Sequence, residues 1–301
     1  MRKMISSILI ALGCLLAPLT LVAFWAANEV ADPGGYLRNM APLARHPDVR
    51  DAVTGRVADE ITLRLRERGV ATEEGLVHNV VGDQVDDDFV TAWVETNRLA
   101  HRRFVAALSA ESDIPRGIGY DLAPMYELVK HRLRSDGLKA AALLPRTPLV
   151  VQVLPASGVS KIDHIHDELI SLRWALAGMS PALIASGILL ARDRCAALIG
   201  AGVGVAGGMF TLAIAMSALR NVYLPQATGP GGLPVAAVLV IFDALTAFLR
   251  NGLRVLFVLG LLMAGAVFVA RNGLIRYRAL AMFESRAHQS EEPANDVADG
   301  R

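Results

Sequence analysis

Residues 4–27 of the chain read MISSILIALGCLLAPLTLVAFWAA, a run of 24 residues without a single charge. A helix needs about 20 apolar residues to cross the roughly 30 Å hydrocarbon core of a bilayer. The run therefore predicts a membrane span. Arg2 and Lys3 precede it, so a cleaved signal peptide is the alternative. The run is longer than the apolar region of a signal peptide, however, and Trp25 spoils the small-residue cleavage pattern.

Three further apolar runs predict spans later in the chain. They are Trp174–Ala191, Cys195–Leu219 and Leu253–Ala270, and the only charge among them is Arg254. Pro181 lies inside the second span, where membrane helices tolerate proline better than soluble helices do. Of the 301 residues, 53% are hydrophobic and 20% are charged, against about 25% charged in a soluble domain. The hydrophobic residues are concentrated in these four runs, which predicts four membrane helices.

The placement of Lys and Arg predicts how the spans are oriented, because short cytoplasmic flanks are enriched in these residues. With the N-terminus inside the cell, the inner flanks hold seven cations and the outer flanks hold four, so both termini are expected to be cytoplasmic. The inner set is Arg2, Lys3, Arg192, Arg194, Arg271, Arg276 and Arg278, and the outer set is Arg173, Arg220, Arg250 and Arg254.

This orientation divides the chain into four parts. Residues 1–27 hold the first span, residues 28–172 form an outer domain, residues 173–271 hold three spans, and residues 272–301 form a cytoplasmic tail whose distal end we expect to be disordered. The outer segment carries 17 Lys and Arg against 22 Asp and Glu, a net charge of −5, and it contains no cysteine. Its stability must therefore come from packing and not from disulfides.

Helices are predicted to dominate the outer domain. The first begins at Pro47, ends at Gly69 and carries an apolar residue at every fourth position. The second is expected at about 88–109 and the third at about 122–135. Acidic Asp86–Asp88 suits a helix start, where exposed N–H groups favour negative charge. The apolar stripe of the first helix is Val49, Val53, Val57, Ile61 and Leu65.

Two segments of the domain are predicted to be extended. Leu149–Leu154 is a short β-branched run between prolines, and Gly117–Leu122 is its expected partner strand. The expected fold class is therefore four transmembrane helices plus a helix-dominated α+β outer domain.

Pro234–Arg250 is apolar but carries Asp243 in its middle. A carboxylate at the bilayer centre costs about 2.5–3.5 kcal/mol on insertion scales. We therefore expect residues 234–250 to lie on the outer interface as an amphipathic helix. Continuation into the last span as one long tilted helix is the alternative. Asp243 and Arg250 would both face water.

Glycines in the third span predict a close helix contact. Gly200, Gly204 and Gly208 form a ridge of small residues that lets another helix approach. We expect the partner to be the last span, through Gly260 and Ala264, and a homodimer through the ridge is the alternative. The same span also matches the dinucleotide pattern G-x-G-x-x-G, but no strand precedes it, so no nucleotide site is predicted.

Candidate catalytic and metal-binding residues are few, and no catalytic residue, cofactor or metal is predicted. His164 and His166 are two apart, so on a helix their side chains diverge by about 200°. Trp93, Asn97 and His101 share a helix face. They predict either a polar cleft with His101 as an acid or base, or an Asn–His pair beside the core, which we favour. Calcium binding at the acidic triplet is disfavoured against helix capping.

Two stretches of the outer domain resemble a group of uncharacterised actinobacterial integral membrane proteins. They are Tyr36–Ile61 (YLRNMAPLARHPDVRDAVTGRVADEI) and Phe89–Leu108 (FVTAWVETNRLAHRRFVAAL), in a chain with one span, an outer domain and three later spans. The resemblance covers most of residues 1–275. It implies this topology and a place in a bacterial plasma membrane, and no activity or catalytic residue.

Three functional hypotheses follow. The leading one is a non-enzymatic membrane protein whose outer domain binds a partner protein or an envelope component, as a sensor or scaffold. The second is a small transporter or channel component built on the glycine-rich third span and Asp243, although no charge pair is predicted within the spans. The third is an envelope enzyme that uses His101, or His164 and His166. The net charge of +1 argues against a nucleic-acid partner.

Overall fold

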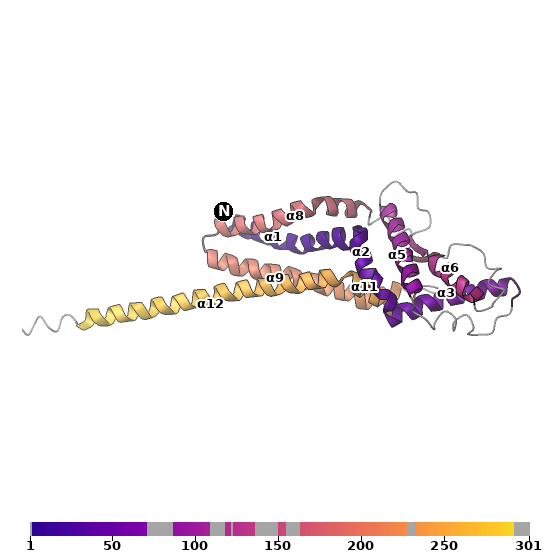
Figure 1. Cartoon of the computed structure of the whole chain (residues 1–301). Helices are drawn as coiled ribbons and strands as arrows, with labels where there is room; N and C mark the ends of the chain where they lie inside the picture. Colours follow the sequence, from indigo (N-terminus) through magenta and orange to yellow (C-terminus); the bar gives the residue numbers. More distant parts are fainter. Residues whose placement is uncertain are drawn as a thin grey trace, which may run out of the picture. The chain divides into compact units, whose positions relative to one another are not determined.

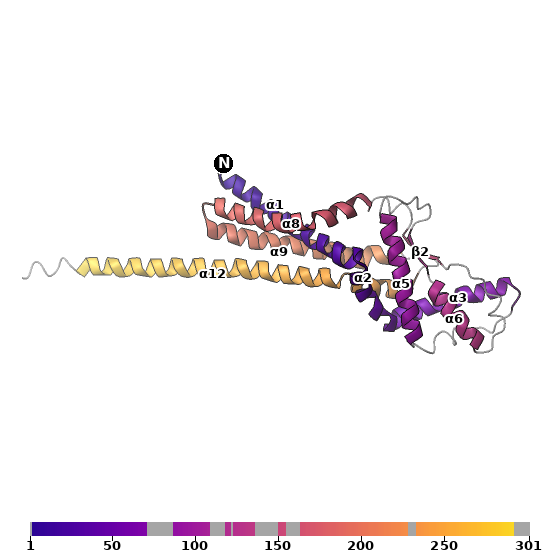
Figure 2. The same ribbon diagram turned by 45° about the horizontal axis from the view of Figure 1, so that its top comes forward.

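The computed structural model describes residues 2–70, 87–108, 118–121, 123–135, 150–154, 163–227 and 233–291. These residues divide into two compact units. The span unit comprises Met1–Leu19, Leu176–Leu212 and Leu253–Arg301, and the domain unit comprises Thr20–Ala175 and Ala213–Gly252. Figures 1 and 2 show the helices of each unit from two directions.

Four helices are long and apolar enough to cross a membrane, which confirms the four predicted runs. The spanning stretches are Arg2–Ala31, Leu172–Leu190, Arg194–Gln226 and Ala247–Asn272. They belong to α1 (Arg2–Trp25) with the π-helix η1 (Ala26–Ala31), α8 (Asp163–Leu190), α9 (Arg194–Ala218) with the π-helix η4 (Leu219–Tyr223) and α10 (Leu224–Ala227), and α12 (Ala247–Glu291). These are the helices of a multi-pass membrane protein.

In the span unit, α1 and α8 pack through the same short pattern used twice. Ser6 donates a hydrogen bond of 2.7 Å to the carbonyl of Gly187, and Ser180 donates one of 2.9 Å to the carbonyl of Gly13. A Cβ added at Gly13 would lie 2.6 Å from Ile184, and one at Gly187 equally close to a side chain of α1. Each helix thus presents Ser-x-x-x-Ile-x-x-Gly to the other, and the glycines allow backbone contact.

The glycine-rich α9 presents two faces to two helices of the span unit. Gly204 faces Cys14 of α1, with 2.7 Å between an added Cβ and the sulfur. Gly202 meets α12, where its Cβ would lie 2.5 Å from the carbonyl of Gly260 and 3.1 Å from Ala264. The expected contact with Gly260 and Ala264 is therefore present, but Gly202 makes it and not the predicted ridge.

That ridge is largely occupied within the chain. Gly204 and Gly208 pack against Cys14 and Pro18 of α1, whereas a Cβ at Gly200 would meet nothing within 4 Å. A homodimer contact through Gly200, Gly204 and Gly208 stays a prediction.

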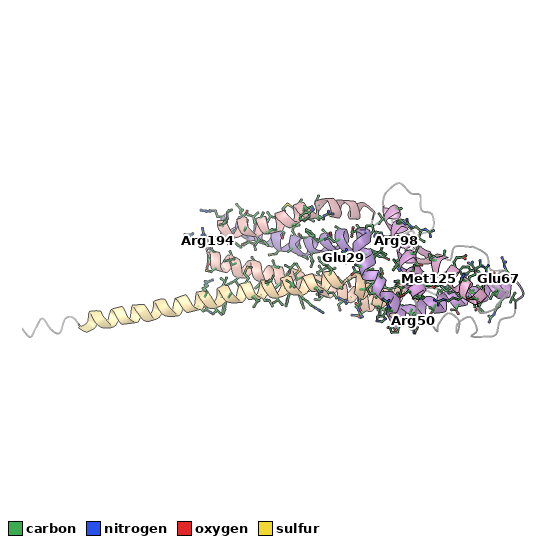
Figure 3. All side chains as sticks on the ribbon, viewed as in Figure 1. Glu29, Arg50, Glu67, Arg98, Met125 and Arg194 are labelled. Carbon is green, nitrogen blue, oxygen red and sulfur yellow. The ribbon has the colours of Figure 1, made fainter. Side chains whose placement is uncertain are left out.

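The domain unit is built around one apolar core. Its helices are α2 (Pro33–Met40), the 3-10 helix η2 (Ala41–Arg45), α3 (Pro47–Glu67), α5 (Asp87–Leu108), α6 (Ala123–Ser135) and α11 (Val235–Leu245). All five residues of the predicted stripe on α3 are at most 1% exposed, so that prediction is confirmed. Gly69 follows with φ of 74°, the left-handed conformation expected after a helix end. Met125 of α6, labelled in Figure 3, also lies in this core.

The predicted α+β class is wrong. The two expected strands do pair, as β1 (Ile118–Asp121) and β2 (Val150–Leu154), antiparallel and with Tyr120 opposite Val151. A two-stranded ribbon of this length provides no sheet layer on which helices could pack. Apart from this ribbon, the regular structure in the described part of the domain is helical, so that part is a helical assembly and not an α+β fold.

Helix α11 belongs to the core of the domain, which the sequence did not indicate. It packs on α2 and α3, with Ala237 fully buried and Val240 and Ile241 partly buried against the cluster. Thr246 then ends α11 by donating its hydroxyl to the carbonyl of Phe242, and α12 begins at the next residue. The expected helix is present over Val235–Leu245 and its buried apolar residues contact protein, but it is shorter than predicted, because residues 247–250 belong to α12 and to the fourth candidate span. Its place on a membrane interface stays a prediction.

Candidate functional site

The ends of the candidate spans are tied to the domain by a set of polar contacts, all within the domain unit. We call this set the junction. Its residues are Trp25, Glu29, Val30, Asp32, Asn39, His101, Arg220, Asp243, Leu245 and Arg250.

Two of the spans end at the junction in π-helical turns. In η1 the amide of Asp32 donates to the carbonyl of Ala27 at 3.2 Å, and in η4 the amide of Leu224 donates to the carbonyl of Leu219. Both bonds reach back five residues, one more than in an α-helix. Such turns are rare and are frequently found at functional sites. The π-helical turns therefore favour a functional role for the ends of the first and third spans.

An ion cluster links the third span, α11 and the start of α12. Arg220 donates from Nε to Oδ1 of Asp243 at 2.9 Å and from Nη2 to Oδ2 at 2.7 Å. Arg250 donates to the same carboxylate at 2.5 Å and to the Asp243 carbonyl at 2.6 Å. This forked geometry is the stronger form of an arginine–carboxylate pair. One acidic side chain thereby holds two cations from separate helices.

The environment of Asp243 keeps it ionised. The hydrogen bonds from Arg220 have the largest effect and lower the pKa of the Asp243 carboxyl. Burial, the next largest effect, opposes them, and the charge of Arg250 lowers the pKa further. The side chain of Asp243 is 29% exposed. We expected Asp243 and Arg250 to face water; in the structure they face each other and Arg220 and keep part of their solvent contact.

His101 joins α5 to the end of the first span. Its Nε2 lies 2.8 Å from the carbonyl oxygen of Val30 in η1. Because a carbonyl only accepts hydrogen bonds, Nε2 carries the proton in this contact. The ring of Tyr36 lies against the imidazole, with 4.7 Å between ring centroids, and His101 is only 3% exposed. The imidazole is therefore covered and bonded to the backbone.

The rest of the predicted polar row on α5 is also bonded to the domain. Asn97 donates to the carbonyl of Trp93 at 2.9 Å and accepts from the hydroxyl of Tyr36 at 3.3 Å. Trp93 donates from Nε1 to the carbonyl of Met40 at 2.7 Å. The buried position beside the core that we favoured is present, although Asn97 and His101 bond to different partners and not to each other.

Further contacts hold the connection between the first span and α2. Trp25 donates from Nε1 to the carbonyl of Leu245 at 2.8 Å, which satisfies a carbonyl at the end of α11 that has no helical partner. Asn39 donates to Glu29, labelled in Figure 3, at 2.5 Å. Asp32 caps α2 by accepting from the amide of Gly35 at 2.6 Å. Together with His101, these bonds fix residues 25–35 to three helices of the domain.

The structure describes the remaining predicted sites only in part. His164 and His166 lie on the helix α8, as expected, and their side chains fall outside the described ones. Asp87 and Asp88 occupy the first turn of α5, which confirms the predicted helix start, and Asp86 lies outside the described residues. Within the described residues no three His, Cys, Asp or Glu side chains gather as a metal site.

Comparison with known proteins adds no relative: a scan against protein-family models, a search of curated proteins and a search of solved structures each found no match. The junction is therefore the feature on which a functional proposal rests. The sequence offered one signal for it, an isolated carboxylate at Asp243 in an apolar segment, which calls for a cation partner.

Proposed function

We propose that this chain is a multi-pass protein of a bacterial plasma membrane whose helical domain, outside the cell, binds a partner protein or an envelope component without catalysis. In this proposal the domain is a membrane-held sensor or scaffold, and the junction couples it to the ends of the spans.

The observation that carries the proposal is the composition of the domain core. Its helices come from residues 33–135 and, after two intervening spans, from α11. A domain on a flexible tether would not need a core helix from a segment that follows the third span. Here a load or ligand on the domain would act directly on residues 25–35, on Arg220 and on Arg250, because hydrogen bonds and ion pairs connect them to it. This arrangement favours communication between domain and spans.

The sidedness of the domain rests on charge. The distribution of Lys and Arg around the spans favours a cytoplasmic N-terminus and C-terminus. The resemblance to actinobacterial membrane proteins supports the plasma membrane as the location.

The junction gives the other two hypotheses less support. Asp243 lies in α11, outside the four candidate spans, and two arginines neutralise it, so a role in ion transport has no observation behind it. His101 as an acid or base would need access to substrate, whereas its ring is covered by Tyr36 and Nε2 is bonded to Val30.

Photo-crosslinking in intact cells tests partner binding. A photoreactive amino acid is placed at Leu63 of α3, which is 52% exposed, and separately at Arg102 of α5. Phe268 of α12, exposed on a candidate span, is the matched control position. We expect at least one of the two domain positions, Leu63 or Arg102, to give a discrete adduct whose mass is the same in repeated experiments. Phe268 should not give this adduct. Repeated recovery of only lipid and self adducts from both domain positions would contradict partner binding.

A second measurement separates sensing from scaffolding. A cysteine at Tyr223, an exposed residue of η4, reports on the end of the third span through its rate of labelling. A sensor predicts that loss of the crosslinked partner changes this rate, and a scaffold predicts no change. The same comparison in an Asp243→Asn variant asks whether the ion cluster transmits the change.

A further inference from the structure

Two adjoining cavities open in the span unit, where α1 begins and where α8 turns into α9. The first, of about 750 Å³, is lined by Arg2, Lys3, Leu190, Ala191 and Arg192. The second, of about 630 Å³, shares Lys3, Ala191 and Arg192 with it and runs on between α1 and α9. We call the two together the basic groove.

The mouth of the basic groove carries an excess of positive charge. Arg2, Lys3 and Arg192 line it and are exposed, and among the described residues none of the three makes an ion pair. Asp193 is the only acid in the lining, and it is already engaged. Its Oδ1 accepts from the amide of Ala196 at 3.0 Å and its Oδ2 lies 3.4 Å from Arg271. Three cations are thus available to a ligand.

Beyond the mouth the lining of the groove is mainly apolar. Its two hydroxyl residues are Ser6, which already donates to the carbonyl of Gly187, and Ser7. Ser7, Ala11 and Cys14 of α1 line the groove together with Ala197 and Gly200 of α9, and Ile10 borders it while packing on Gly187 of α8. A Cβ at Gly200 would meet nothing within 4 Å, so the glycine widens the groove there. At Gly204, four residues further along α9, an added Cβ would lie 2.7 Å from the sulfur of Cys14, so the groove closes.

We propose that the basic groove binds one anionic phospholipid. The phosphate oxygens accept charge-assisted hydrogen bonds from Arg2, Lys3 and Arg192, and an acyl chain lies along Ala11, Cys14 and Gly200. The charge of the mouth selects an anionic headgroup, and the apolar floor selects a lipid over a free phosphate ion. This inference does not rest on the proposed function of the domain.

Native mass spectrometry of the full chain in detergent tests this, with phosphatidylglycerol and phosphatidylcholine of identical acyl chains as competing probes. We expect one phosphatidylglycerol to be retained in preference to phosphatidylcholine, and an excess of glycerol phosphate not to displace it. Equal retention of the two lipids, or displacement by glycerol phosphate, would overturn the proposal.

Variants locate the site. Arg192→Gln and Lys3→Gln should each weaken the preference for phosphatidylglycerol about fivefold, whereas Arg194→Gln, an exposed arginine of the same turn that lines neither cavity, should leave it unchanged. Gly200→Leu fills the groove and should abolish retention. Gly207→Leu is its control, because Gly207 is also open but lies outside the groove.

Circular dichroism checks that the variants fold. The substituted charges are exposed, so we expect unchanged helical circular dichroism. Equal loss in Arg192→Gln and Arg194→Gln, or full retention in Gly200→Leu, would place the lipid elsewhere and overturn the proposal.

Discussion

Arg220 donates two parallel hydrogen bonds, of 2.9 and 2.7 Å, to the carboxylate of Asp243, although the two residues lie 23 positions apart on different helices. The same carboxylate also accepts from Arg250. A single acidic residue therefore joins the end of the third span to the start of the fourth, through a helix that belongs to the domain core.

Replacing Asp243 by asparagine should destabilise the chain, because it leaves Arg220 and Arg250 close together without a counter-charge. Each side chain of the cluster is about one-third exposed, so solvent screens the charges and we expect a loss of about 1 kcal/mol. This corresponds to about 2–4 °C in apparent Tm, measured by thermal denaturation in detergent. Glu95→Gln, which breaks the exposed pair with Arg98 on α5, is the control and should shift Tm less. Equal shifts in both variants would remove the special role of the cluster.

The contribution of Asp243 should vanish in acid. Its pKa is lowered in the folded chain, so the unfolded chain binds more protons in the window between the folded pKa and about 3.9. The stabilisation is therefore fully present above about pH 4 and is lost as the pH falls through the folded pKa. The difference in Tm between the wild type and Asp243→Asn should be constant from pH 5 to pH 8 and shrink below pH 4. A difference that grows in acid would be the opposite of this expectation.

His101→Phe tests the bond between α5 and the first span. The phenyl ring can still stack on Tyr36, but the part-buried carbonyl of Val30 loses this donor, at a cost of about 1 kcal/mol, the usual net contribution of one hydrogen bond. We expect faster hydrogen exchange at the backbone amides of residues 28–32 and of Gly34, since Pro33 has no N–H. Arg102→Gln, the exposed neighbour, is the control. If hydrogen exchange at these amides around η1 is unchanged in His101→Phe, the hydrogen bond between His101 and Val30 does not hold η1 in place.

Gly13→Ala and Gly187→Ala should weaken the packing of α1 on α8, because each added Cβ lies within about 3 Å of a backbone oxygen of the other helix. We expect a cost of about 1–3 kcal/mol, the usual range for overpacking. Gly178→Ala and Gly207→Ala are matched controls with nothing within 4 Å. Since alanine favours helix more than glycine does, the controls should be neutral or stabilising. Apparent Tm in detergent orders the four variants, and the same sign in all of them would refute the proposed packing.

Sequence patterns located the helices well because each depends on local information. The four spans follow from apolar runs that hold one charge among them, Arg254, and the stripe on α3 follows from its spacing of four, with Val49 and Leu65 both fully buried. Asp87 and Gly69 mark helix ends for reasons of hydrogen bonding and backbone conformation that act within one turn.

The errors concern contacts between distant segments. The β-branched run at Val150–Leu154 does form a strand, but periodicity cannot say how many partners a strand finds, and it finds one. The glycines of α9 predict close approach without indicating direction, so Gly202 and not the expected ridge meets α12. An apolar helix looks the same whether it covers a membrane surface or a protein core, and so the packing of α11 was missed.

The ion cluster could not be predicted for a related reason. Asp243 and Arg250 are seven positions apart and share a helical face in any continuous helix, but Arg220 reaches them only because η4 and α11 fold against one domain. That arrangement depends on the core of the domain, which is formed by residues before the second span and after the third.

Labelling from outside the cell tests the central claim, an outer helical domain held by four spans, most directly. Both native cysteines, Cys14 and Cys195, are first replaced by alanine. Single cysteines are then placed at Asp51 of α3 and at Arg194 at the start of α9, an exposed position labelled in Figure 3. A membrane-impermeant maleimide should label Asp51→Cys in intact cells and label Arg194→Cys only after the membrane is opened. Labelling of Arg194→Cys in intact cells, with Asp51→Cys protected, would contradict the account.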